Sequence, residues 1–169
     1  MVGSPAFISY AGITFSPDNE MVYYVLWKPG QKASALYRVP VMGGASERLR
    51  ENVDSPVTFS PDGKRFAFVR EACDQSTILE ADVDSGAERK LASRTLPQVL
   101  DYPAWSPDGR TIAATTYDSS TEKSTGSDAR IILIQSADGR ERAVSDHTRG
   151  WVSQLAYIGN MRGFVVSAF

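Results

Sequence analysis

The sequence has almost none of the residues that most often bind metals or act as nucleophile and base. It contains one cysteine and one histidine among its 169 residues. A single cysteine excludes an intrachain disulfide and a thiolate metal cluster, and a single histidine argues against most zinc sites and Ser-His-Asp arrangements. We therefore interpret Cys73 as an inert thiol and His147 as a solvated or hydrogen-bonded imidazole. No catalytic, cofactor-binding or metal-binding residue is predicted.

Long apolar runs and an excess of one charge are also missing. The longest uninterrupted apolar stretch, residues 21–27, is far shorter than the ~20 residues that a membrane helix needs. Residues 1–15 lack the basic start and apolar centre of a signal peptide. The net charge is −2, with acidic and basic residues interspersed, so no electrostatic field favours nucleic acid or an anionic membrane. We expect neither a nucleic-acid partner nor a membrane span.

One short stretch is written three times, as FSPDN at 15–19, FSPDG at 59–63 and WSPDG at 105–109, with a worn copy, YIGNM, at 157–161. Proline presets φ near −65°, aspartate bonds back to the backbone and glycine accepts φ > 0, so each copy predicts a turn between two strands. Asn19 replaces the glycine in the first copy and tolerates positive φ. The predicted turn residues are Ser16, Pro17, Asp18, Ser60, Pro61, Asp62, Gly63, Ser106, Pro107, Asp108 and Gly109.

The copies keep a regular period. Their serines lie 44 and 46 residues apart, and Trp105 precedes Tyr157 by 52. A second marker, a glycine five residues before an aliphatic residue, recurs at Gly44, Gly86 and Gly139. Two signals in phase at a period near 45 residues indicate a repeated structural unit. The recurring aspartates of the turns are therefore interpreted as turn-forming residues rather than as a ring of binding carboxylates.

Each unit carries four strand signals. The second strands are apolar at consecutive positions, as at 23–27 and 66–69, which is typical of burial on both faces. The fourth strands, such as 47–50, are highly charged, as solvated edges are. Four antiparallel strands that change from buried to solvent-exposed across the unit predict an all-β chain made of β-propeller blades. The expected blades span residues 11–50, 55–92, 101–145 and, in part, 151–169. A helix at 88–100 is the disfavoured alternative, because Pro97 interrupts it.

Three further features have a structural and a functional interpretation. The polar loop 118–128 is interpreted as a flexible hairpin loop rather than a partner-contact loop. The sequence Asp82-x-Asp84-x-Gly86 resembles the start of a calcium loop, but the remaining ligands are missing, which favours a hairpin turn. The tryptophans are interpreted as packing between blades rather than as a ligand platform; they are Trp27, Trp105 and Trp151.

Two segments, FSPDGKRFAFV and WSPDGRTIAAT, resemble the WD40-like repeat of TolB-type propellers. A narrower likeness is carried by ALYRVPVMGGASERL, ENVDSPVTFSPDGKRFAFVRE, GAERKLASR and RGWVSQLAYIGNMRGFVVSA. These are similar to the C-terminal propellers of bacterial membrane-anchored serine/threonine protein kinases. That resemblance implies a sensor or interaction region outside the cytoplasm, with the kinase activity in sequence that this chain does not contain, since HRD, DFG and a glycine loop are missing.

The sequence therefore predicts a non-enzymatic propeller module that binds a protein or a small ligand. Two alternatives remain open: the gating propeller of a prolyl-oligopeptidase-like serine peptidase, and a TolB-like partner protein of the cell envelope. Three and a half units are fewer than the four to eight blades of a closed propeller. We accordingly expect either the remainder of a longer propeller or self-association.

Overall fold

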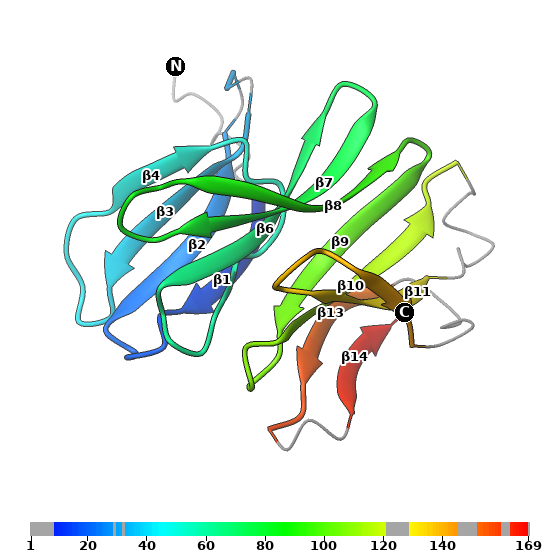
Figure 1. Ribbon diagram of the computed structural model, residues 1–169. Coiled ribbons are helices and arrows are strands. Elements are labelled where there is room, and N and C mark those ends of the chain that lie inside the picture. Colours follow the sequence, from blue (N-terminus) through cyan, green and yellow to red (C-terminus); the bar gives the residue numbers. More distant parts are fainter. Residues whose placement is uncertain are drawn as a thin grey trace.

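The chain folds into β-strands joined by turns and loops over the residues that the computed structural model describes, which are 9–28, 30–31, 33–120, 129–144, 152–159 and 163–168 (Figure 1). The strands are β1 (Ser9–Phe15), β2 (Met21–Trp27), β3 (Ala35–Pro40), β4 (Glu47–Glu51), β5 (Thr58–Phe59), β6 (Arg65–Ala72), β7 (Gln75–Asp82), β8 (Glu88–Thr95), β9 (Gln98–Trp105), β10 (Thr111–Asp118), β11 (Arg130–Gln135), β12 (Glu141–Ala143), β13 (Val152–Tyr157) and β14 (Phe164–Ala168). His147, Trp151 and most of the predicted 118–128 loop lie outside the described residues.

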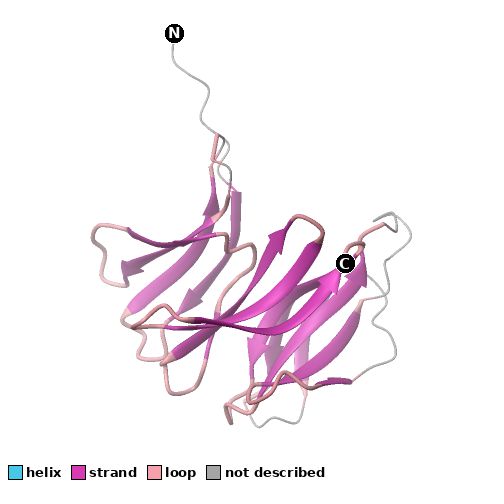
Figure 2. Cartoon of the chain, turned by 45° about the horizontal axis from the view of Figure 1, so that its top comes forward, coloured by secondary structure: helices cyan, strands magenta, loops and turns pink. Residues whose placement is uncertain are grey.

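The strands form three four-stranded antiparallel sheets and one two-stranded sheet. Within each sheet the order follows the chain: β1-β2-β3-β4, β5-β6-β7-β8, β9-β10-β11-β12 and β13-β14. We call these sheets blades 1 to 4. They succeed one another side by side as an open fan (Figure 2). The prediction of an all-β chain built from propeller blades is confirmed.

The strands β8 and β9 extend beyond the blade bounds predicted from the sequence, which ended one blade at 92 and began the next at 101. β8 continues to Thr95 and β9 begins at Gln98, so strands occupy the segment in which a helix was the alternative. β9 begins three residues before 101, the expected start of the third blade, and its pairing with β10 shifts at a bulge. Polar residues such as Asp101 interrupt the apolar residues of β9, so the full strand could not be recognised from a run of apolar residues.

Blade-to-blade packing forms the core. On β6, Phe66 and Phe68 pack against blade 1, beside Tyr23 and Val25. Ala67 and the other alternate residues of β6 pack against blade 3. Successive strand residues point to opposite faces, so a strand with neighbours on both sides must be apolar at every position. This explains the unbroken apolar run of β6, and the solvated β4 shows the opposite pattern, with only one of its residues half-buried.

Candidate functional site

The three Ser-Pro-Asp turns share one hydrogen-bond pattern. In the second turn the Ser60 hydroxyl donates to Asp62 Oδ1 at 2.6 Å and accepts the Arg65 amide at 3.0 Å. Asp62 Oδ1 also accepts the Lys64 amide at 3.1 Å. The serine hydroxyl and this amide lower the pKa of the Asp62 carboxyl. The equivalent bonds recur at Ser16, Asp18, Ser106 and Asp108.

The residue that follows each aspartate has positive φ: +60° at Asn19, +70° at Gly63 and +72° at Gly109. Asparagine thus preserves the turn at the position where glycine is missing. Neighbouring turns also touch, since a Cβ atom on Gly63 would lie 3.6 Å from Pro17 Cγ. The aspartates are held within their turns, where they order the backbone.

The aromatic residues before the second and third turns, and Tyr157 of the fourth copy, contact a neighbouring blade, whereas Phe15 before the first turn is 55% exposed. The Phe59 ring centroid lies 4.7 Å from that of Tyr23 in blade 1. The Arg65 guanidinium of blade 2 lies 5.2 Å from the centroid of the Trp105 ring in blade 3, and the Tyr157 hydroxyl of blade 4 lies 2.9 Å from Thr111 Oγ1 of blade 3. For Trp105 the predicted role in blade packing is confirmed.

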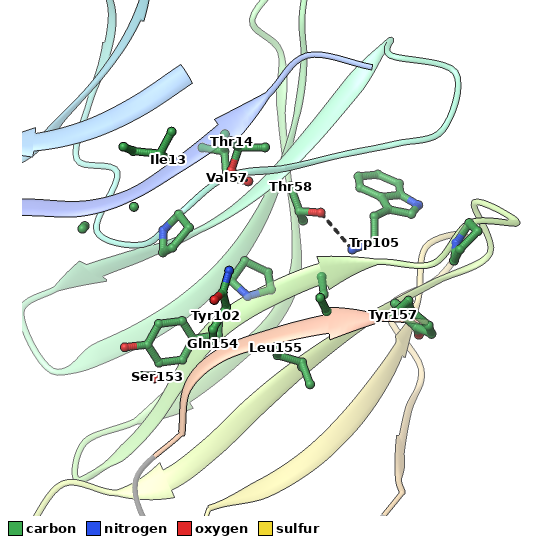
Figure 3. Close-up of a pocket in the computed structure, with 17 residues that line it drawn as sticks. Ile13, Thr14, Val57, Thr58, Tyr102, Trp105, Ser153, Gln154, Leu155 and Tyr157 are labelled. Carbon is green, nitrogen blue, oxygen red and sulfur yellow. Dashed lines mark hydrogen bonds between the residues drawn. The ribbon is translucent and has the colours of Figure 1, made fainter. Parts of the chain in front are cut away.

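The innermost parts of the four blades line a partly open cavity of about 470 Å³ (Figure 3). Four stretches line it, at 11–14, 56–58, 102–105 and 153–157, together with Pro107. The sequence analysis did not find this site, because its wall comes from four segments that lie about 45 residues apart and carry no shared motif. None of the described residues that line the cavity carries a charge. The cavity wall contains aromatic rings, prolines, hydroxyl groups and one amide side chain.

Hydrogen bonds between blades fix the cavity wall. The Thr14 hydroxyl of blade 1 donates to the Val57 carbonyl oxygen at 2.6 Å. The Thr58 hydroxyl accepts the Trp105 amide of blade 3 at 2.9 Å. Each bond joins neighbouring blades within the wall itself. The spacing of the inner strands is therefore set by the protein before any ligand arrives.

Tyr102 lies in the β9 bulge and has a φ of +48°, which is uncommon for a bulky residue. Its amide donates to the Asp101 carboxylate at 2.8 Å, and the Asp101 carbonyl oxygen accepts the Thr115 hydroxyl at 3.1 Å. Bulges re-aim side chains beside functional sites. Here the bulge places Tyr102 in the cavity wall, which Figure 3 shows together with Trp105 further along the same strand.

Several ionisable side chains influence one another near Asp101. Burial raises the pKa of the Asp101 carboxyl to about 7, opposed by the hydrogen bond from the Tyr102 amide and reinforced by the charge of Glu71. Burial also raises the pKa of Glu71, with a further contribution from Asp54, and the pKa of the Tyr117 hydroxyl is raised mainly by burial. Asp101 is consequently neutral over much of the acidic pH range.

The remaining sequence candidates are not among the residues that line the cavity. Asp82 Oδ1 accepts the amide and the hydroxyl of Ser85 at 2.8 and 2.7 Å, which makes this segment a hairpin turn, as predicted. Cys73 is exposed in the β6–β7 turn. Trp27 is 43% exposed at the end of β2, so the predicted packing between blades is not confirmed for this residue. In the described part of the chain, no three His, Cys, Asp or Glu side chains are grouped so as to hold a metal ion. No helix there is long and apolar enough to cross a membrane.

Solved structures with the same architecture include TolB from Acinetobacter baumannii, with a TM-score of 0.70 at 17% identity over 95% of this chain and 37% of that chain. The fold is a TolB-like β-propeller. A putative TolB from Agrobacterium tumefaciens matches with a TM-score of 0.63 at 19% identity, over 85% of this chain and 50% of that chain. The acylaminoacyl peptidase of Pyrococcus horikoshii matches with a TM-score of 0.60 at 17% identity, over 83% of this chain and 26% of that chain.

Curated relatives include dipeptidyl-peptidase 5 of Trichophyton equinum, which is 31% identical over 132 residues. That match covers 74% of this chain but only 17% of the peptidase. An uncharacterized protein of Agrobacterium fabrum is 35% identical over 98 residues, covering 57% of this chain and 32% of that protein. The chain thus spans a third or less of the length of these relatives. No protein-family model matches the chain.

Proposed function

We propose that this chain is a non-enzymatic propeller module that binds an uncharged peptide segment or small ligand in its central cavity. The observation that carries the proposal is the cavity itself: about 470 Å³, within the usual range for ligand sites, with a wall pre-formed by hydrogen bonds between blades. Because none of its described lining residues is charged, a charged ligand would lose hydration without gaining an ionic partner. Prolines and aromatic rings favour flat or extended apolar groups.

Gln154 supplies the amide group of the wall and is exposed on β13. The test is calorimetric titration with N-acetylated, C-amidated pentapeptides, one set uncharged with an aromatic residue and one set carrying Lys or Glu. Uncharged peptides should bind more tightly than charged ones. Gln154→Ala should weaken their binding by about fivefold, the loss of one hydrogen bond. Gln135→Ala, the same change at an exposed position on β11 outside the cavity, should have no effect. Equal binding of both peptide sets would contradict the proposal.

We further propose that the module is the sensor or interaction region of a larger kinase-like protein, outside the cytoplasm. The four segments quoted above that resemble kinase-linked propellers support this context. The full-length open reading frame tests it. A kinase catalytic loop followed by a membrane segment, both upstream of this region, is expected. A neighbouring domain with a GxSxG motif would contradict it.

A second candidate function is the propeller of a serine peptidase. The 31% identity to dipeptidyl-peptidase 5 favours it. In either context we propose that this chain alone hydrolyses no peptide. Incubation with a dipeptide p-nitroanilide should release no nitroaniline, and release that follows the chain through purification would contradict a non-enzymatic role.

A further inference from the structure

A groove of about 450 Å³, partly open to solvent, lies between blades 2 and 3. Both blades are complete four-stranded sheets, and their packing against each other positions the groove. Arg94 of β8 lines the groove from blade 2, and residues from all four strands of blade 3 line the remainder. Among the described residues, none that lines this groove also lines the central cavity, so the groove is a separate candidate site.

Two polar side chains lie next to each other in this groove. Thr116 of β10 and Arg130 of β11 are paired across the two strands, so both side chains leave the sheet on the same face. That face points toward blade 2, because Ile132, two residues after Arg130, packs in the core shared by blades 2 and 3. The Arg130 guanidinium and the Thr116 hydroxyl are therefore placed to contact one bound group.

Neither of these side chains is satisfied within the described part of the chain. Thr116 is 9% exposed, and its hydroxyl has no hydrogen-bond partner there. Burying a hydroxyl without a partner is unfavourable. Arg130 is exposed at the start of β11, and no ion pair joins it to another described residue. A guanidinium and a hydroxyl can both donate, so together they suit an acceptor that carries negative charge.

The other charged groups of the groove already have partners. The Arg94 guanidinium donates to both carboxylate oxygens of Glu141, with 3.0 Å between Nη1 and Oε1. The Asp118 carboxylate accepts the side-chain amide of Gln98 at 3.2 Å. Among the described residues of the groove, Arg130 is thus the cation that remains available to an anionic ligand.

We propose that this groove binds a small monocarboxylic acid. The carboxylate accepts hydrogen bonds from the Arg130 guanidinium, whose planar fork matches two carboxylate oxygens, and from the Thr116 hydroxyl. The aliphatic part of the acid lies on Ile132 and Ala143, which are paired across β11 and β12 and also line the groove. The module then has a site for an acid that is distinct from its central cavity.

The charges of the groove favour a single carboxylate over a phosphate group. A phosphate monoester carries about −1.5 to −2 charges at pH 7. The carboxylates of Asp118 and Glu141 line the same groove and repel any charge beyond the one that Arg130 balances. One available cation therefore matches one carboxylate.

The test is to record the amide resonances of the purified chain at pH 7 and constant ionic strength while sodium isovalerate is added. Saturable shifts should appear in β10 and β11 around Thr116 and Arg130. Isovaleramide has the same carbon skeleton without the charge and should bind about tenfold more weakly. Inorganic phosphate should also bind more weakly than isovalerate. Binding of uncharged peptides in the central cavity plays no part in this test.

Substitutions then locate the site. Arg130→Gln should weaken isovalerate binding about tenfold and Thr116→Val about fivefold, whereas Thr116→Ser, which keeps the hydroxyl, should retain it. Arg142→Gln is the matched control: it removes the same charge, but Arg142 alternates on β12 with two residues of the groove and points to the other face, so the affinity should be unchanged. Circular dichroism confirms that each variant is folded. If Thr116→Val is not, Arg130→Gln decides, because its position is exposed.

Three results would overturn the proposal. Equal affinity for isovalerate and isovaleramide would show that the charge is not recognised. Equal losses in Arg130→Gln and Arg142→Gln, or no loss in Arg130→Gln, would show that the groove is not the site. Tighter binding of phosphate than of isovalerate would overturn the assignment to a carboxylic acid.

Discussion

Two glycines in equivalent conformations should respond very differently to the same substitution. Gly109, in the third Ser-Pro-Asp-Gly turn, has a φ of +72°, and Gly139, in the β11–β12 turn, has a φ of +74°. Alanine at either position must adopt the left-handed region, which costs about 1–2 kcal/mol. The two sites differ in their surroundings. A Cβ on Gly109 would lie 3.5 Å from Pro61 Cδ, an ordinary contact, whereas a Cβ on Gly139 would lie 2.5 Å from the carbonyl oxygen of Leu91 in the preceding blade.

The overlap at Gly139 is with the Leu91 backbone, so turning a side chain cannot relieve it. Overpacking of this kind costs about 1–3 kcal/mol. Gly109→Ala should thus lower the free energy of unfolding by about 1–2 kcal/mol, and Gly139→Ala should lower it by that amount plus about 1–3 kcal/mol. The difference between the two variants measures how closely blades 2 and 3 approach at this point.

Urea unfolding followed by circular dichroism, at one fixed protein concentration, gives both free energies. The slope of the free energy with urea should be unchanged in both variants, because the surface exposed on unfolding is the same. Equal destabilisation by the two substitutions would refute the close packing of blade 2 on the β11–β12 turn. An unchanged stability of Gly109→Ala would refute the positive φ at that turn.

Two further predictions concern the turns and the buried carboxyl. Ser60→Ala should destabilise by about 1–3 kcal/mol, because it leaves the Arg65 amide without its hydroxyl partner in a buried turn; urea unfolding checks this, with the exposed Ser85→Ala expected to cost less. The folded-state pKa of Asp101 is raised from 3.8 to about 7, so its contribution to stability is full below pH 3.8 and is lost as the pH rises to about 7. Asp101→Asn should remove this part of the pH dependence, and an unchanged slope of stability between pH 4 and 7 would contradict the burial of Asp101.

Local signals account for the part of the fold that the sequence predicted. The Ser-Pro-Asp turns specify their own backbone, and the strands beside them carry unbroken apolar runs, as β6 does. Both features act over a few residues and therefore appear in any one repeat. The repeat period then predicted the succession of blades.

The cavity and the bulge could not be predicted in this way. The cavity wall combines stretches from four repeats, and its residues, such as Thr14 and Gln154, have no common chemical signature. The β9 bulge depends on a register shift between two strands, which composition does not report. The raised pKa of Asp101 follows from that bulge, since the same residue in an exposed turn would be an ordinary carboxylate.

The most direct test of the central claim is to record the amide resonances of the chain while an uncharged, capped pentapeptide is added. The largest shifts should come from the four stretches that line the cavity, at 11–14, 56–58, 102–105 and 153–157. The outer strands β4 and β12 should be unaffected. Shifts concentrated on the outer strands, with the inner stretches unchanged, would contradict a binding site at the centre of the blades.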